Sequence, residues 1–188
     1  IELTLVGSFF YKDLIPDSDM FKNLLTLSRL KSFHFKLAVY GFSDGKNIGF
    51  LKIMKEILTF LNSDLQSLNL SFFDTTFTPL YTCEKDLFGL LNKFQKLKDL
   101  NMELPIKFWV ERQDSTQILN PNLESLVLND CRWFLEFLRK ANFKSIRVLK
   151  IASTEKLSSA ELQSLFKLVK NFASLRVICL TFYLHEKI

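Results

Sequence analysis

Hydrophobic residues recur along this chain in a short pattern whose first, fourth and sixth places are apolar. Six copies begin 23 to 35 residues apart, at Leu30, Leu65, Leu97, Leu123, Ile146 and Leu175. The segment Leu3-Thr-Leu5 matches the end of a seventh copy. Because side chains alternate between the two faces of a strand, each copy predicts a short strand with one apolar face. We therefore expect six to seven short strands.

Between the copies the apolar residues change to spacings of three and four, which are typical of amphipathic helices. The segments with this spacing are 17–29, 48–61, 84–96, 133–140 and 159–172. Ser158 and Glu161 form a capping-box pattern before the last of them, since each side chain can satisfy a free amide in the first helical turn. One interval departs from the scheme, because 106–110 alternates like a strand, and we expect 103–122 to be mostly non-helical. Strands joined by helical crossovers are expected to run parallel.

The best copy runs from Leu123 to Cys131 and places leucines at its first, fourth and sixth positions and a cysteine at its ninth. This pattern resembles the leucine-rich repeat family, whose core reads LxxLxLxxN or LxxLxLxxC, and the resemblance covers nearly the whole chain. It implies an α/β solenoid, a horseshoe with a parallel concave sheet of about six to seven short strands and helices on its convex side. The repeat lengths look most like the ribonuclease-inhibitor type, which is also found in the substrate-binding half of F-box proteins. We expect residues 1–188 to form a single domain that is an excerpt of a longer chain.

Charge and cysteine content narrow the class of protein only slightly. The formal net charge is +5 and the isoelectric point is about 9.1, which suits an acidic partner if the basic excess lies on one face. The three cysteines include no CxxC pair, so we expect reduced thiols in an intracellular protein, cytoplasmic or nuclear. No apolar run approaches the roughly 18 residues that a membrane-spanning helix needs, and we expect no membrane association.

The sequence offers no recognisable catalytic or metal-binding motif. Gly41 to Asn47 superficially resembles a phosphate-binding loop, but three residues rather than four separate its glycines, and Asn47 replaces the magnesium-binding Ser or Thr. The only histidines, His34 and His185, lie about 150 residues apart, so spacing supports neither a two-histidine metal site nor a histidine-paired nucleophile. We therefore expect a non-enzymatic protein without cofactor or metal.

The second, third and fifth places of each copy lie between the apolar ones, and we expect them to face solvent on the concave side. This surface is amide-rich in its middle and basic with valines toward the C-terminus, where Val127, Val148 and Val177 are expected to form one stacked row with a charged rim. The candidate partner-binding residues are Lys98, Asn101, Glu124, Val127, Arg147, Val148, Lys150, Arg176 and Val177. A solvated face that only keeps the protein soluble is the alternative interpretation.

These features favour a protein–protein interaction module, a scaffold or adaptor, that binds a partner with an acidic surface within a larger chain or complex. One alternative is the substrate-recognition part of an F-box-type ubiquitin ligase receptor. It would need a separate helical F-box motif, and this chain contains none that we recognise. Another is an RNA- or ribonucleoprotein-associated protein that uses the basic excess on phosphates.

Overall fold

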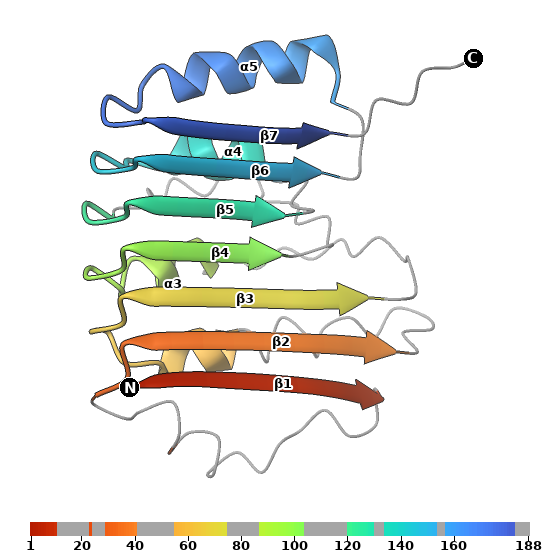
Figure 1. Cartoon of the computed structure of the whole chain (residues 1–188), viewed down its shortest axis with the longest axis vertical. Coiled ribbons are helices and arrows are strands. Elements are labelled where there is room, and N and C mark those ends of the chain that lie inside the picture. The colour runs from red at the N-terminus through yellow and green to blue at the C-terminus, as the bar shows by residue number, and fades with distance from the viewer. Residues whose placement is uncertain are drawn as a thin grey trace.

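The computed structural model describes residues 1–10, 23, 29–40, 55–74, 87–103, 120–129, 134–153 and 157–182. Within these ranges the chain forms an α/β fold built on one open parallel sheet of seven strands. The strands are β1 (Glu2–Phe10), β2 (Ser32–Tyr40), β3 (Ser67–Asp74), β4 (Asp99–Glu103), β5 (Ser125–Asn129), β6 (Val148–Ser153) and β7 (Val177–Phe182). They follow one another across the sheet in chain order (Figure 1). The predicted parallel strands are confirmed, including the one from the incomplete copy at Leu3.

The strands pair so that equivalent places of the copies lie side by side. Leu126 at the fourth place pairs with Leu100 on one side and Leu149 on the other. The fourth places of β2 to β6 are between 0 and 3% exposed, and the sixth places between 0 and 7%. The core is therefore a stack of identical positions, in which each strand covers the apolar residues of its neighbours.

Three strands are longer than the six-residue pattern predicts. β1 and β2 contain nine residues each and β3 contains eight, whereas β4 contains five. The alternation explains the length of β2, since Leu37 and Val39 continue the apolar series of Phe33 and Phe35. β4 ends two residues before Pro105, which has no amide hydrogen to offer a ladder.

In the described part of the chain, three helices and a further helical stretch lie between the strands. Their bounds are 55–60, α3 (Leu87–Leu91), α4 (Phe134–Lys140) and α5 (Ser159–Val169). The first three lie behind the sheet in Figure 1, and α5 lies at its β7 end. Buried side chains from this layer, including Leu58, Leu91 and Phe137, join the strand residues in one core. The opposite side of the sheet, which we call the open face, has no helix among the described residues.

The helices agree with the predicted segments to different degrees. α4 matches 133–140 closely, whereas α5 ends at Val169, three residues earlier than expected. α3 stops at Leu91 because the chain tightens, with the amide of Phe94 donating to the Leu91 carbonyl at 3.1 Å. The predicted helices over 17–29 and 48–61 are described only at residues 23, 29 and 55–61, and most of the 103–122 interval lies outside the described residues.

The predicted capping box at the start of α5 is confirmed. The backbone amide of Glu161 donates to Ser158 Oγ at 3.2 Å, and the amide of Ser158 donates to Glu161 Oε2 at 2.7 Å. The hydroxyl and amide of Ser158 hold the pKa of the Glu161 carboxyl below its ordinary value, because both stabilise the ionised form.

A second recurrent position, three residues before the first leucine of each copy, was not recognised from the sequence. Phe94, Phe143 and Phe172 occupy it and are buried, and Phe143 stacks on Phe172 with ring centroids 6.5 Å apart. Asn120 takes this place before β5, where it is 3% exposed and its Nδ2 donates to the Phe94 carbonyl at 2.9 Å. The recurring spacing Phe-x-x-Leu or Phe-x-x-Ile was the signal available in the sequence.

Candidate functional site

The open face presents rows of side chains, one residue from each strand. The first row, at the third place of the copies, contains Glu2, Ser32, Ser67, Asp99, Ser125, Val148 and Val177. The second row, at the fifth place, contains Thr4, His34, Asn69, Asn101, Val127, Lys150 and Cys179. The in-register pairing therefore brings the predicted third- and fifth-place residues onto one surface, as expected from alternation.

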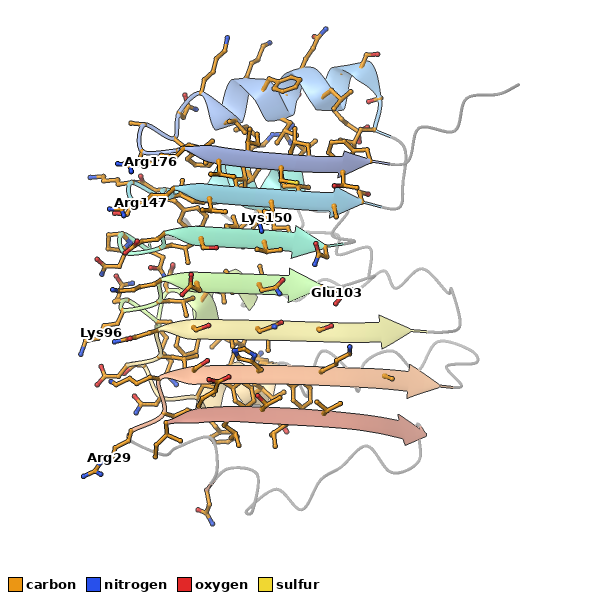
Figure 2. The ribbon with its side chains drawn as sticks, viewed as in Figure 1. Arg29, Lys96, Glu103, Arg147, Lys150 and Arg176 are labelled. Carbon is orange, nitrogen blue, oxygen red and sulfur yellow. The ribbon has the colours of Figure 1, made fainter. Side chains whose placement is uncertain are left out.

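The second-place residues do not lie on that surface. Lys98, Glu124, Arg147 and Arg176 precede their strands, and we call the line that they form along the N-terminal ends of the strands the rim. Figure 2 shows Arg147 and Arg176 beyond the start of β6 and β7, whereas Lys150 lies partway along β6. The expectation that second, third and fifth places share one face is thus wrong for the second place, because that residue lies outside the regular alternation of the strand.

The three valines do not form one row. Val148 pairs with Val177 in the first row, but Val127 pairs with Lys150 in the second row and lies beside Asn101 on its other side. The predicted single stack is therefore wrong. Two adjacent valines remain, and Val177 is 48% exposed while Val148 is half-buried.

Much of the rim charge is paired within the molecule. The carboxylate of Asp64, the residue before the copy that begins at Leu65, lies 2.7 Å from Lys96 Nζ and 3.9 Å from Lys31 Nζ. A hydrogen bond from Lys96 and the charges of both lysines hold the pKa of the Asp64 carboxyl below its usual value. Arg147 Nη1 lies 3.6 Å from Glu124 Oε2. This alternation of sign leaves no continuous basic stripe among the described rim residues.

The middle of the open face is polar but closed in by its own side chains. Ser71 is only 7% exposed and its Oγ donates to Glu103 Oε2 at 2.5 Å. The Oδ1 atoms of Asn69 and Asn101 are enclosed and accept no hydrogen bond from the residues that the structure describes. Burial, followed by the Glu124 charge, raises the pKa of Asp99 above its ordinary value, with Lys98 opposing the shift. Ser71 and these two amide oxygens are therefore out of a partner's reach, whereas the Asp99 side chain is exposed.

Accessible side chains gather at the β6–β7 end of the face. We define the C-terminal patch as Val148, Lys150, Val177 and Cys179 with the rim residues Arg147 and Arg176. Lys150, Val177, Cys179, Arg147 and Arg176 are all exposed. Among the described residues neither Lys150 nor Arg176 is within ion-pair distance of a carboxylate.

The remaining predicted site residues lie outside this patch. Lys98 and Asn101 belong to β4 or its rim, two strands from β6, and Val127 lies on the intervening strand β5. Glu124 serves the patch indirectly, through its ion pair with Arg147. The nine predicted residues therefore divide into a C-terminal cluster of five and a scattered remainder.

The patch combines exposed apolar area with positive charge and contains no constellation for chemistry. In the described part of the chain no group of three His, Cys, Asp or Glu side chains converges to hold a metal ion. Cys131 lies outside the described residues, and Cys179 is an exposed free thiol. Exposed apolar area beside positive charge is a composition that contact surfaces between macromolecules commonly have.

None of the helices described is both long and apolar enough to cross a membrane. Comparisons of the chain with protein-family models, with curated proteins and with solved structures find no match.

Proposed function

We propose that this chain is a divergent leucine-rich repeat solenoid that binds a protein partner through its C-terminal patch. The observation that carries the proposal is the in-register stack of the repeated pattern. At one end of its open face the exposed Val177 lies beside half-buried Val148, together with Lys150 and Arg176, which have no carboxylate partner among the described residues. Apolar contact area with a charged margin is the usual composition of a protein interface. The partner should present carboxylates around an apolar centre.

Affinity capture from a lysate of the native cells, read by mass spectrometry, tests this proposal. The patch variant combines Arg147→Glu with Lys150→Glu, and the matched control combines Lys144→Glu with Lys167→Glu, which changes the same amount of charge at exposed positions elsewhere. Partners that wild type and the control variant capture should be lost from the patch variant. Equal recovery with all three proteins would remove the patch from the mechanism.

RNA association is the second candidate, and the +5 net charge motivates it. The ion pairs along the rim weigh against it, since Asp64 and Glu124 neutralise the lysine and arginine side chains beside them. A salt titration of binding to a generic single-stranded RNA separates the candidates, because contacts with several phosphates make affinity fall steeply with salt. For an F-box-type receptor the same patch would hold the substrate, and a helical F-box motif in the full-length sequence would distinguish that case.

A further inference from the structure

The outer edge of β7 exposes positions that are buried in the other strands. Ile178 at the fourth place is 43% exposed, whereas Leu126 and Leu149 at the same place are fully buried. Val177 beside it is 48% exposed, and Leu180 at the sixth place is half-buried. Each inner strand is covered from both sides, but no described strand lies beyond β7. Within the described residues the apolar stack therefore ends in exposed side chains.

The backbone of β7 has hydrogen-bonding groups directed away from the sheet. The amides of Arg176 and Val177 both donate to the Arg147 carbonyl, each at 2.9 Å, so these groups face β6. Since successive residues of a strand direct their backbone groups to opposite sides, those of Ile178 and Leu180 face the open edge. Exposed edges are commonly protected by charged residues or proline, and β7 contains neither.

The rim shows which charge would complement this edge. Lys31 and Lys96 both lie near Asp64, and Arg147 lies beside Glu124 of the preceding copy. Arg176 is the last residue of this line and has no carboxylate next to it among the described residues. A carboxylate one strand beyond β7 would pair with Arg176 as Glu124 pairs with Arg147.

We propose that β7 accepts an extended segment of a partner protein as an eighth parallel strand. That segment carries apolar residues beside Ile178 and Leu180, and a carboxylate at the second place, opposite Arg176. A second copy of this chain fits less well. Its β1 carries Ile1 at the second place, and residues 170–182, which would meet in an antiparallel β7 pair, contain no carboxylate. This inference concerns the sheet edge and requires no contact with Val148 or Lys150 on the open face.

A peptide copied from the chain provides the probe. Residues 122–129 have apolar residues at the correct places and Glu124 at the second place, where it already pairs with Arg147 inside the protein. The peptide carries a fluorophore and a polar solubilising tail, and its binding to the 188-residue protein is measured by fluorescence anisotropy. We expect saturable binding, because backbone hydrogen bonds and apolar pockets act together in strand addition.

Two backbone-methylated peptides test whether the peptide is bound as a strand in this orientation. In β5 the amide of Ser125 donates to the Lys98 carbonyl at 2.9 Å, toward the preceding strand, so the amide of Val127 faces that side and that of Leu126 faces away. N-methylation at Val127 should weaken binding about tenfold or more, since a lost hydrogen bond leaves its partner unsatisfied. N-methylation at Leu126 should change affinity by less than about twofold. Equal effects of the two methyl groups would overturn the proposal.

A charge exchange tests the pairing at Arg176. Arg176→Glu should lower the affinity of the protein for the peptide. A peptide with Glu124→Arg should bind the Arg176→Glu variant with the original affinity but bind the wild-type protein poorly. Lys150→Glu should leave peptide affinity unchanged. Unchanged partner capture by the patch variant, together with intact peptide binding, would refute the proposed function alone. Absence of saturable binding would refute the edge proposal alone. Sedimentation gives the oligomeric state. A dimer that the peptide does not dissociate, but that Ile178→Asp converts to a monomer, would mean that a second copy occupies the edge, and this result would overturn the proposal.

Discussion

Truncation of one leucine in the middle of the sheet should cost far more stability than truncation of its counterpart at the edge. Leu126→Ala removes three carbon atoms from a side chain with no exposed surface, between Leu100 and Leu149. At about 0.8 kcal/mol per buried methylene, the lost transfer free energy is about 2.5 kcal/mol. Both neighbours are held by their own strands, so the cavity cannot close, and a further loss of about 1 kcal/mol or more is expected.

Ile178→Ala is the matched control, because it removes the same number of carbon atoms at the same place of the last copy. Ile178 is 43% exposed, so less apolar area is lost and water occupies the space that remains. We expect a cost of about 1.5 kcal/mol or less. Urea denaturation followed by circular dichroism gives both free energies of unfolding. A cost below about 1 kcal/mol for Leu126→Ala, or equal costs for the two variants, would refute the assigned register.

Three further predictions concern individual polar groups. Asn120→Asp should lower the free energy of unfolding by about 3 kcal/mol at neutral pH, because a buried carboxylate would replace the amide that donates to the Phe94 carbonyl. Part of the lost stability should return in acid, where the carboxyl is protonated. Urea denaturation at a neutral and an acidic pH measures the difference. Ser158→Ala should lower the free energy of unfolding by about 1 kcal/mol, and Ser159→Ala by much less. Because the pKa of Glu161 is lowered, the stability that the cap contributes is present above the ordinary carboxyl pKa and is lost as pH falls through the lowered one. An NMR titration of Glu161 in both variants would show this difference. Asp99→Asn should raise the free energy of unfolding at neutral pH by less than about 1 kcal/mol, because the pKa of Asp99 is raised and its negative charge costs stability above that pKa. The gain should disappear as pH falls through the pKa of Asp99. A gain that stays constant at all pH values would show that the Asp99 charge is not its cause.

The candidate site was predictable in composition but only partly in arrangement. Arg147, Val148, Lys150, Arg176 and Val177 do gather at one end of the sheet, because in-register pairing brings equal places of successive copies together. The rim position of the two arginines was missed, since a residue before a strand does not follow the alternation within it.

The burial of polar groups in the middle of the open face could not be predicted from residue types. Ser71 and Asn69 resemble solvent-facing residues in sequence, yet Ser71 and the Oδ1 atom of Asn69 are buried. Their burial depends on the size and rotamers of neighbouring side chains, such as Glu103, which lie one strand away in space and about thirty residues away in sequence.

The sequence by itself determined the strands, their parallel order and the positions that face the core. A repeated pattern with apolar first, fourth and sixth places, separated by helical spacing, is satisfied best when each copy stacks on the preceding one, so local periodicity dictates the long-range pairing. It also located the capping box at Ser158, which depends only on residues within one helical turn.

Only the tertiary structure decided which residues at the same place of the repeat also have the same surroundings. Leu126 and Ile178 occupy the same place of their copies, but one is enclosed by two strands and the other lies on an edge. The structure also gave the two arginines different partners, since Arg147 pairs with Glu124 and Arg176 has no carboxylate within ion-pair distance among the described residues. The separation of Val127 from Val148 and Val177 was already readable in the sequence, because Val127 stands at the fifth place of its copy and the other two at the third. Burial and ion pairing depend on neighbours in space, and those neighbours are fixed only once the copies are stacked.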